Sequence, residues 1–468
     1  MLQKSKDIHF IGIGGIGMSS IASILLERGF KIRGSDVKAN RLTDEIGRRG
    51  ADIFVGHHPS NLRKSTGLVV YSTSIDENNP EVIKARKLKI PVVHRSDLVA
   101  ELVNANKGIA VTGAHGKTTT TALIAVLLTK AGLDPTVIVG GEVNFFGSNW
   151  RNGAGTYVVC EADESDGTFK KLKPSYAVLT NIDREHLEHY RDFEDLITAN
   201  KVFIDNVKSD GYLIASYSDN HIKRLLKAYS GRFLTYSLSC SRADLYARDI
   251  KMDKFRTSFK AVFKGRELGL FELNIPGMHN VENSLAAILL GIELDIDFKV
   301  TKEALSLYKG TLRRFEVKGE IDDIMIIEDY AHHPREIMAT IAACKNWPGR
   351  RVVGVFQPHR YTRTQFLKKD FGKSFLGLDE LILTDIYSAS EKPINGVSTR
   401  IIYDEVLKNG QENVSLIEKK HILPYLLNTL KRSDMVLVLG AGDIGELSGE
   451  LVRKLKTKRQ GPAKRAAV

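Results

Sequence analysis

Short apolar runs alternate with amphipathic segments along most of the chain. The runs at residues 8–11, 31–33, 68–71 and 91–93 predict buried strands, and the segment 18–28 has the apolar spacing of a helix. A polar or glycine-rich cluster directly follows most of these runs. Strands that alternate with helices predict a parallel sheet covered by helices. The clusters then lie at its carboxyl edge, where open α/β sheets bind ligands.

The same alternation recurs in the middle and in the last third of the chain. Further strands are predicted at 108–111, 156–160, 176–179, 325–327, 352–356, 381–383 and 435–439, and further helices at 119–131 and 284–290. A chain of 468 residues is too long for one ordinary domain. We therefore predict an α/β protein of three domains, at residues 1–106, 107–312 and 313–468.

A glycine-rich turn follows the first strand. Residues 12–17 have the sequence Gly-Ile-Gly-Gly-Ile-Gly, and Ser35 and Asp36 follow the second strand. This is Gly-x-Gly-x-x-Gly in a βαβ setting, with an acidic residue about 20 positions later. It predicts a Rossmann-like nucleotide site. NAD and a nucleotide-sugar diphosphate both fit this pattern.

A second glycine turn, Gly113-Ala114-His115-Gly116-Lys117-Thr118-Thr119, follows the strand at 108–111. The N-terminus of the next helix would present N–H groups and a favourable dipole to an anion. Lys117 suits the β- and γ-phosphates of ATP, and the Thr118 hydroxyl suits Mg²⁺. Position 111 is valine where the usual P-loop has glycine, so the turn is a shortened variant. A plain turn beside a surface lysine is the alternative, and the threonines after Lys117 favour ATP.

Four acidic residues, Glu161, Asp163, Glu164 and Asp166, follow the predicted strand at 156–160. Carboxylates gathered at the end of a buried strand repel one another unless cations lie among them. Mg²⁺ prefers carboxylate, water and phosphate oxygens as ligands. The cluster therefore predicts a magnesium site, and a solvated acidic loop is the alternative.

Net charge and cysteine content narrow the classes of ligand and the cellular compartment that fit this chain. The net charge is +12, and six of the basic residues lie at positions 454–465, in what we expect to be a solvated tail. The remaining charge favours anionic substrates, and no basic patch with interleaved aromatic residues indicates nucleic acid. Cys160, Cys240 and Cys344 are scattered, which favours a reduced, cytoplasmic setting. No apolar stretch approaches the roughly 20 residues of a membrane span, and the start does not have the pattern of a signal peptide.

Several motifs, in their order, resemble the Mur ligase family. They lie at residues 9–18, 112–120, 161–166, 329–334, 357–364, 391–393 and 440–445, and so extend over nearly the whole chain. The first and the fifth resemble most specifically the branch of the family that adds alanine. Two residues depart from the family pattern. Glu185 stands where aspartate usually precedes the histidine, and Ala114 stands where threonine is common.

The resemblance implies an N-terminal Rossmann-like domain for a nucleotide sugar, a central P-loop-type ATPase domain and a C-terminal Rossmann-like domain. It implies ATP-dependent ligation of L-alanine to the carboxylate of UDP-N-acetylmuramate through an acyl phosphate, in peptidoglycan precursor synthesis. ATP and two Mg²⁺ ions would serve the reaction. We expect small-molecule partners rather than nucleic acid or a membrane, and a monomer or weak homodimer.

The resemblance also implies roles for individual residues. The UDP substrate would contact Gly14, Gly15, Ile16, Gly17, Ser35, Asp36, Ser72, Thr73, Ser74, His94 and Arg95. ATP would contact Gly113, Ala114, His115, Gly116, Lys117, Thr118, Thr119, Asn280, Arg314 and Asp329. The amino acid would contact Tyr330, His332, Arg360 and Arg363, and Mg²⁺ would contact Thr118, Glu161 and His186. The catalytic residues would be Lys117, Glu161, His186, His332 and Arg360.

Three other activities fit parts of the sequence. A murein tripeptide-recycling ligase of the same family would use a preformed peptide as the amine. An NAD-dependent oxidoreductase would use only the turn at 12–17, and a regulator would bind nucleotide without turnover. A further hypothesis concerns Lys201, fifteen residues after His186, which would hold a second Mg²⁺ if CO₂ carboxylated it. A solvent-exposed lysine, or one paired with an acid such as Glu194, is the alternative.

Overall fold

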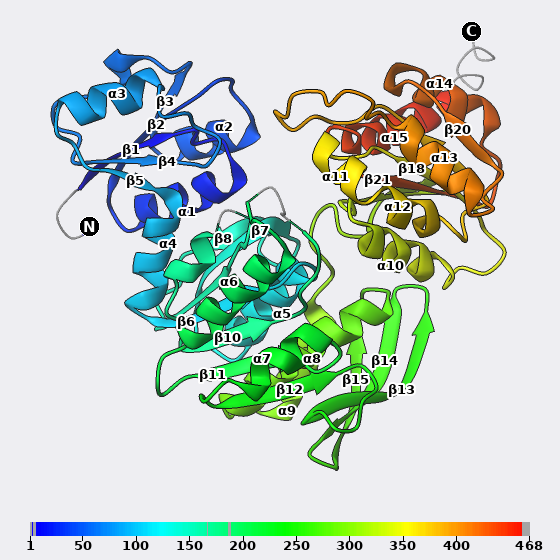
Figure 1. Cartoon of the computed structure of the whole chain (residues 1–468), viewed down its shortest axis with the longest axis horizontal. Helices are drawn as coiled ribbons and strands as arrows, with labels where there is room; N and C mark the ends of the chain where they lie inside the picture. Colours follow the sequence, from blue (N-terminus) through cyan, green and yellow to red (C-terminus); the bar gives the residue numbers. More distant parts are fainter. Residues whose placement is uncertain (1, 3–5, 166, 186–188, 461–468) are drawn as a thin grey trace, which may run out of the picture. The chain divides into compact units, whose positions relative to one another are not determined.

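The computed structural model describes residues 2, 6–165, 167–185 and 189–460, in two compact units (Figure 1). The first unit comprises Met1–Ile250, Phe259–Glu272 and Asn280–Lys309. The second comprises Lys251–Ser258, Leu273–His279 and Gly310–Val468. Three separate sheets, of five, ten and six strands, follow one another along the chain. The prediction of three α/β sheet regions is therefore confirmed.

The N-terminal sheet is parallel and has the strand order β3-β2-β1-β4-β5. Its elements are β1 (Asp7–Ile11), α1 (Ile16–Glu27), β2 (Lys31–Asp36), α2 (Arg41–Arg48), β3 (Asp52–Val55), the 3-10 helix η2 (Pro59–Asn61), β4 (Leu68–Tyr71), α3 (Pro80–Lys87), β5 (Val92–His94) and α4 (Arg95–Asn104). Ile8 and Phe10 pack on the α1 face of the sheet, whereas Ile11 and Val69 pack with Val82 of α3. The strand order reverses at β1, so the glycine turn after β1 lies at a topological switch point.

The central sheet has the order β15-β14-β13-β12-β11-β10-β6-β9-β7-β8. Its strands are β6 (Lys107–Thr112), β7 (Thr136–Val143), β8 (Ser148–Arg151), β9 (Tyr157–Glu161), β10 (Tyr176–Leu179), β11 (Tyr212–Ser216), β12 (Phe233–Ser237), β13 (Leu245–Asp253), β14 (Arg256–Phe263) and β15 (Arg266–Leu273). The helices are α5 (Lys117–Lys130), η3 (Thr168–Lys171), α6 (Phe193–Asp205), α7 (Asn220–Lys227), α8 (Met278–Glu293) and α9 (Phe298–Leu307). The glycine turn at residues 113–119, here called the P-loop turn, follows β6. Because β6 pairs in parallel with both β9 and β10, this turn lies between the loops that follow these two strands.

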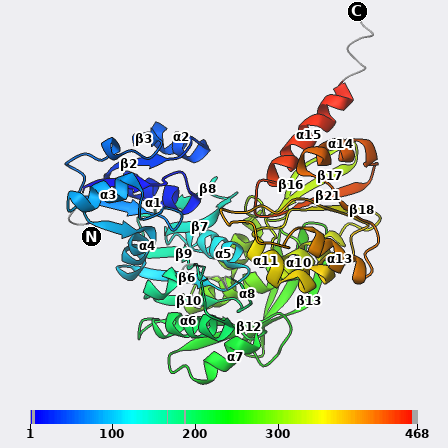
Figure 2. The ribbon, with the colours of Figure 1, turned by 45° about the horizontal axis from the view of Figure 1, so that its top comes forward.

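The C-terminal sheet has the order β16-β17-β21-β18-β19-β20, and β16 is antiparallel to β17. Its strands are β16 (Glu316–Ile321), β17 (Ile324–Asp329), β18 (Arg351–Phe356), β19 (Glu380–Leu383), β20 (Val414–Leu416) and β21 (Asp434–Leu439). The helices are α10 (Pro334–Cys344), α11 (Tyr361–Phe366), α12 (Lys368–Ser374), α13 (Arg400–Lys408), α14 (Lys419–Thr429) and α15 (Gly445–Gln460). Alternate residues of β21 face opposite cores: Leu437 packs on the α10 and α12 face and Val438 on the α14 and α15 face. Figure 2 shows α14 and α15 on one side of this sheet and α10 on the other.

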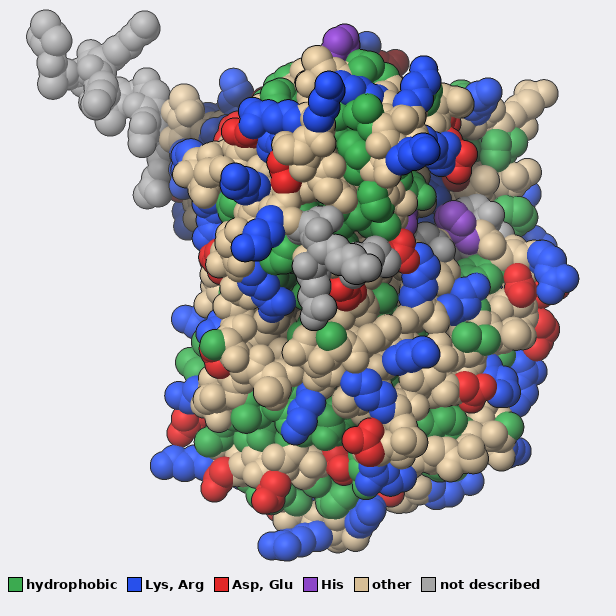
Figure 3. Space-filling model, turned by 90° about the vertical axis from the view of Figure 1, so that its left-hand side faces the viewer, with side chains coloured by type: hydrophobic (Ala, Val, Ile, Leu, Met, Phe, Trp, Pro, Cys, Tyr) green, Lys and Arg blue, Asp and Glu red, His purple; other side chains and the backbone are tan. Residues whose placement is uncertain are grey.

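The predicted strands all occur, and the bounds of the predicted helices shift by a few residues. The helix expected from position 119 begins at Lys117, because Gly116 adopts a left-handed conformation (φ 80°) and so provides its N-cap. Strands β3, β7, β8, β11 to β16 and β20 were not predicted. No helix among the described residues has the length and apolar character needed to cross a membrane. On the face drawn in Figure 3, Lys and Arg side chains are scattered among Asp and Glu rather than gathered in one patch.

Candidate active site

The side chain of Lys117 lies inside the P-loop turn. Its Nζ donates to the carbonyl oxygens of Gly113 at 2.6 Å and Ala114 at 3.2 Å, and to Glu164 Oε1 at 2.9 Å. Burial alone would lower the pKa of Lys117, but the carboxylates of Glu164, Asp163 and Glu185 raise it above its ordinary value. Lys117 therefore provides a fixed positive charge within a ring of backbone groups, as an anion site requires.

The loop after β10 holds the P-loop turn in place through His115. The His115 N–H donates to Asn181 Oδ1 at 2.8 Å, and the His115 carbonyl accepts from Thr180 Oγ1 and Asn181 Nδ2. The His115 ring Nε2 lies 3.1 Å from Asp183 Oδ2. No role was expected from the sequence for Thr180, Asn181 or Asp183. The available signal was the polar cluster they form at the end of the strand that neighbours β6.

Two asparagines near the start of α8 lie against the same turn. A Cβ atom at Gly116 would lie 2.4 Å from Asn283 Oδ1, so only glycine allows this close approach. Asn283 Nδ2 donates to Asn280 Oδ1 at 3.3 Å, and both side chains are buried. Asn280, one of the predicted ATP contacts, therefore belongs to the same cluster as the P-loop turn.

The predicted metal ligands Thr118 and Glu161 flank the turn. Thr118 is buried in the first turn of α5, and Glu161 ends β9 beside Val111 of β6. Glu161 Oε1 accepts the Gly140 N–H at 2.9 Å, and a Cβ atom at Gly140 would lie 2.5 Å from Glu161 Oε2. A hydroxyl and a carboxylate beside a phosphate-type turn fit Mg²⁺. The third predicted ligand, His186, lies outside the described residues, as does Asp166 of the acidic cluster.

Lys201 lies on the exposed side of α6, where it pairs with Asp205. The expected alternative partner, Glu194, pairs instead with Arg224 at 2.8 Å. This arrangement is that of a surface lysine in an i, i+4 pair. It supports the solvent-facing alternative over a carboxylated metal ligand.

The predicted UDP-site residues gather around the glycine turn of the N-terminal sheet. Asp36 Oδ2 accepts the Gly14 N–H at 2.8 Å. A Cβ atom at Gly17 would lie 2.8 Å from Arg95 Nη1, and one at Gly12 would lie 3.5 Å from Ser72 Oγ. The structure thus brings the ends of β2, β4 and β5 together at one turn.

The remaining predicted UDP contacts have mostly structural partners. Ser72 Oγ lies 3.1 Å from Ser74 Oγ, and Thr73 Oγ1 lies 3.1 Å from Nε2 of His94, whose ring also caps α4. The side chain of Ile16 is exposed. Ser35 differs from expectation, because it is fully buried and its carbonyl accepts the N–H groups of Gly12 and Ile13. Ser35 therefore supports the turn from below rather than presenting a side chain to a ligand.

In the second unit, Arg314, which precedes β16, lies against aromatic and charged side chains that follow β17. The guanidinium of Arg314 lies 5.2 Å from the Tyr330 ring centroid and 3.7 Å from Glu336 Oε1. His332 Nδ1 lies 3.0 Å from the Tyr330 carbonyl oxygen and 3.3 Å from Glu336 Oε2. Glu336, which sequence analysis missed, therefore links a predicted ATP contact with a predicted amino-acid contact.

The loop after β18 approaches the same cluster. The ring of His359 lies 5.7 Å from that of His332, and Arg363 Nη1 lies 3.1 Å from His359 Nδ1. Arg360 has φ 71° and is the N-cap residue of α11, and its N–H donates to the Tyr387 carbonyl at 2.8 Å. The structure thus places Tyr330, His332 and Arg363 in one region, and it adds His359 to them.

Asp329, predicted to contact ATP, instead braces this loop. Its Oδ1 accepts the Ala331 N–H at 2.7 Å, and its Oδ2 accepts the Phe315 N–H at 2.9 Å and the Thr340 hydroxyl at 3.2 Å. Burial raises the pKa of Asp329 to about 6, against the lowering effect of Arg314 and of the two N–H groups. Both oxygens are engaged within the protein, so this carboxylate positions the loop.

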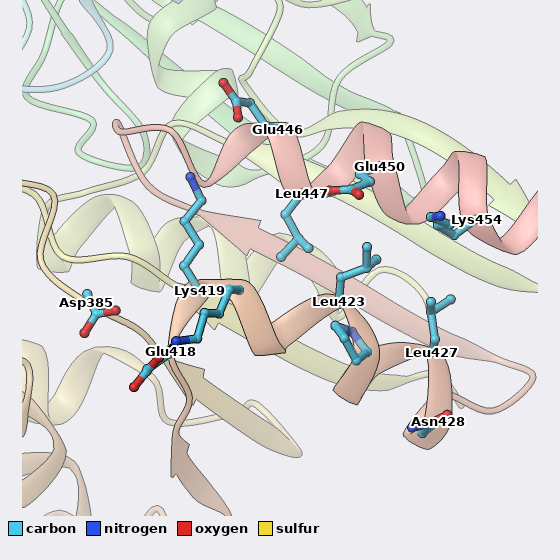
Figure 4. A pocket seen from close by; sticks show the side chains of 12 residues that line it. Asp385, Glu418, Lys419, Leu423, Leu427, Asn428, Glu446, Leu447, Glu450 and Lys454 are labelled. Atoms are coloured by element: carbon cyan, nitrogen blue, oxygen red, sulfur yellow. Dashed lines mark ion pairs between the residues drawn. The ribbon is translucent and has the colours of Figure 1, made fainter.

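A groove of about 950 Å³ lies between α14 and α15, on the other face of the C-terminal sheet from α10 (Figure 4). Leu423, Leu427 and Leu447 form its apolar part, and Lys419, Glu450 and further charged residues surround them. None of the residues that line this groove belongs to the predicted sites.

Family models match three successive stretches of the chain. They are described as "Mur ligase family, catalytic domain" at residues 7–107, "Mur ligase middle domain" at 111–291 and "Mur ligase, glutamate ligase domain" at 313–442. Together they span most of the sequence. The first and the third contain every strand of their sheets, and the second contains every strand of the central sheet except most of β6.

Curated relatives and solved structures extend the comparison to nearly the whole chain. The UDP-N-acetylmuramate–L-alanine ligases of Trichlorobacter lovleyi and Pelobacter propionicus are 45% and 44% identical over 97% of this chain, with 100% and 99% of their own length covered. The crystal structure of UDP-N-acetylmuramate-alanine ligase MurC from Thermotoga maritima matches with a TM-score of 0.82 and 29% identity, over 97% of this chain and 99% of that one. With these matches and a P-loop turn built around a buried lysine, the chain belongs to the Mur ligase family.

Proposed function

We propose that this chain ligates L-alanine to the carboxylate of UDP-N-acetylmuramate at the expense of ATP, in peptidoglycan precursor synthesis. The observation that carries the proposal is the position of Lys117 inside the P-loop turn, in a chain 44–45% identical along its length to ligases of that name. Such a turn suits ATP, and the glycine turn after β1 suits the diphosphate of a nucleotide sugar.

The chemistry follows from the weakness of a carboxylate as an electrophile. Transfer of the γ-phosphoryl group of ATP to the substrate carboxylate gives an acyl phosphate and ADP. The alanine amine then attacks the acyl carbon, loses a proton, and the tetrahedral intermediate expels inorganic phosphate. The protein mainly positions the groups and balances the charge of the phosphoryl oxygens.

Individual residues have defined parts in this scheme. Lys117 is placed to bind the transferring phosphoryl group, and the turn at 113–119 binds the other phosphates through backbone N–H groups. Arg360 and Arg363 suit the alanine carboxylate, because a guanidinium matches a carboxylate in charge and geometry. We assign His332 the role of orienting the amino acid through its amine.

Mur ligases use ATP with Mg²⁺, and the hydroxyl and carboxylate beside the P-loop turn fit that ion. Thr118 and Glu161 would hold one Mg²⁺, and we propose a second at His186. When bound, Mg²⁺ neutralises charge on the phosphate oxygens. We further propose domain boundaries near residues 106 and 312, a cytoplasmic location, and a monomer or weak homodimer that acts on small molecules only.

Phosphate release with purified protein tests the function. We expect release that requires ATP, Mg²⁺, UDP-N-acetylmuramate and L-alanine together, with less from other amino acids. Turnover with L-Ala-D-Glu-diaminopimelate but not with L-alanine would replace the proposal with the peptide-recycling activity. ATP binding without turnover in the complete mixture would indicate a regulator, and hydride transfer with NAD would indicate an oxidoreductase.

A further inference from the structure

A carboxylate that the proposed reaction does not use is buried at the centre of the N-terminal sheet. Glu81, in the first turn of α3, is 0% exposed and accepts four hydrogen bonds. Its Oε2 lies 3.0 Å from His9 Nε2 and 2.6 Å from Ser35 Oγ. Its Oε1 lies 3.1 Å from the His58 N–H and 2.6 Å from Asn61 Nδ2. Three chain segments, at β1, at β2 and at residues 58–61, therefore converge on one side chain.

The charge of Glu81 fixes the direction of each of these bonds. Burial alone would raise the pKa of Glu81, but hydrogen bonds and charge from His9, and hydrogen bonds from Ser35 and Asn61, bring it below its ordinary value. An ionised carboxylate has no proton to donate and only accepts. The Ser35 hydroxyl must therefore direct its single hydrogen toward Glu81.

The same hydroxyl has a second partner, the ring of His57. Ser35 Oγ lies 2.9 Å from His57 Nδ1. Because the hydroxyl hydrogen points to Glu81, Ser35 is the acceptor in this second bond, and Nδ1 of His57 carries the hydrogen. In the neutral imidazole the other nitrogen, Nε2, is then an acceptor. Within the described residues His57 Nε2 makes no hydrogen bond, and the side chain is half-buried.

His57 lies where the base of a bound nucleotide is expected. In Gly-x-Gly-x-x-Gly sites the phosphates lie at the turn after the first strand, and the acid after the second strand meets the ribose. The base then extends toward the third strand. His57 lies two residues after the end of β3, the edge strand that pairs with β2 (Figure 1). The adjoining Gly56 N–H donates to the Asp36 carbonyl at 2.7 Å.

We propose that Glu81 is a positioning residue that acts through Ser35 to make His57 Nε2 a hydrogen-bond acceptor, and so selects uracil over cytosine in the nucleotide substrate. The proposal rests on the proposed UDP substrate and adds the determinant of base specificity. Uracil presents an N3–H donor between two carbonyl groups. Cytosine has an unprotonated N3 that would face the His57 lone pair, and two opposed acceptors leave both without a hydrogen bond.

Replacement of Glu81 by glutamine reverses the direction of the hydrogen bonds that run from residue 81 through Ser35 to His57. The backbone N–H of His58 is an obligatory donor, so the amide oxygen of Glu81→Gln must face it. The amide NH₂ then faces Ser35 and His9. Ser35 accepts from the amide and turns its hydrogen to His57 Nδ1, which moves the ring proton to Nε2. His57 thereby becomes a donor, which opposes uracil N3–H and matches cytosine N3.

The first experiment reads the proton position on His57 in the full-length protein. Long-range ¹⁵N–¹H NMR of histidine-labelled protein distinguishes the two tautomers, and His57→Asn identifies the signal. We expect the hydrogen on Nδ1 in the wild type and on Nε2 in Glu81→Gln. A wild-type His57 protonated at Nε2 would overturn the proposal.

The second experiment measures UDP and CDP affinity by calorimetry. We expect the wild type to prefer UDP by about tenfold or more, and Glu81→Gln to bring the UDP-to-CDP ratio to about one or below. The KM for UDP-N-acetylmuramate should rise in parallel while the KM for ATP stays unchanged. An unchanged ratio in folded Glu81→Gln overturns the proposal.

Two further variants separate this effect from misfolding. Ser35→Ala keeps Glu81 but removes the hydroxyl that links it to His57. The UDP-to-CDP affinity ratio should therefore fall toward about one, even if Glu81→Gln fails to fold. An unchanged ratio in Ser35→Ala contradicts the proposal. Glu77→Gln alters an exposed carboxylate just before α3 and should leave the ratio at its wild-type value. Alanine-dependent turnover of the wild type tests the proposed function separately. If that turnover is absent, the His57 tautomer and the UDP-to-CDP affinity ratio still decide this inference.

Discussion

Lys117 and Glu164 form an ion pair inside the P-loop turn, with 2.9 Å between Nζ and Oε1 and side-chain exposures of 14% and 3%. The pair joins the first turn of α5 to the loop that follows β9, and so holds the lysine between the Gly113 and Ala114 carbonyls. Its charge is balanced by carboxylates and is not neutralised by burial. The residue proposed to meet the phosphoryl group is therefore already oriented by the fold.

Removal of the Lys117 side chain should greatly lower the rate of the chemical step. We expect Lys117→Ala to lose about a hundredfold or more in kcat, the usual effect of deleting one preorganised electrostatic group. Phosphate release in the complete reaction measures this. Lys130→Ala, at the exposed end of the same helix, is the matched control and should keep wild-type turnover. Near-normal kcat in Lys117→Ala would remove the assignment of the ATP site.

The two ends of α5 allow a sharper test of the P-loop geometry. Gly116 and Gly132 both have positive φ, 80° and 74°, but only at Gly116 would a Cβ atom meet a neighbour, Asn283 Oδ1. Gly132→Ala should cost about 1 kcal/mol of stability with an unchanged KM for ATP. Gly116→Ala should in addition raise the KM for ATP by about tenfold or more, because Asn283 or the turn must move. Equal KM values for ATP in both variants would contradict this account.

The position of Arg363 beside His359 predicts a selective effect on the amino acid. Arg363→Ala should raise the KM for L-alanine by roughly tenfold to a hundredfold, the range for a lost charge-assisted bond, and barely alter the KM for ATP. Arg400→Ala, on the exposed side of α13, should leave both unchanged. A shift of the ATP KM alone would reassign Arg363 to phosphate binding.

Asp329 should make folding stability fall as pH rises through the mildly acidic range. Its pKa is about 6 in the folded chain against an ordinary value of 3.8, so between these values the folded state binds more protons than the unfolded state. The contribution of Asp329 to folding stability is fully present below pH 3.8 and is lost above pH 6. The loss amounts to about 3 kcal/mol, since each pKa unit corresponds to about 1.4 kcal/mol.

Urea unfolding of the wild type and of Asp329→Asn between pH 4 and pH 7 measures this contribution. The difference between the two stability curves should change in this window, with the wild type losing stability relative to the variant as pH rises. Thr340→Val removes one hydrogen bond to Asp329 but keeps the carboxyl group, so it should retain the wild-type pH slope. Parallel curves for the wild type and Asp329→Asn would contradict the raised pKa.

The sequence by itself determined about half of the strands, the three-part organisation and the two glycine turns. These features are local: an apolar run of four to six residues predicts a buried strand whatever its neighbours are, and a glycine turn between strand and helix predicts an anion site. The turn at 113–119 was therefore found with its lysine, and the turn at 12–17 with Asp36. Strands β3, β7, β8, β11 to β16 and β20 were missed. Strands β13 to β15, for example, mix buried with exposed positions and so lack the continuous apolar run that predicts a buried strand.

Only the tertiary structure decided what individual polar residues do. Ser35 and Asp329 follow strands as ligand-binding residues do, yet both are buried, where one supports a turn and the other braces a loop. Glu164 gains its role from Lys117, 47 residues away in sequence, and Glu81 acts on Ser35, 46 residues away. The free energy of a buried polar group depends on which donors surround it, and sequence spacing does not specify those donors. The fold assembles them, and with them the functions of these side chains.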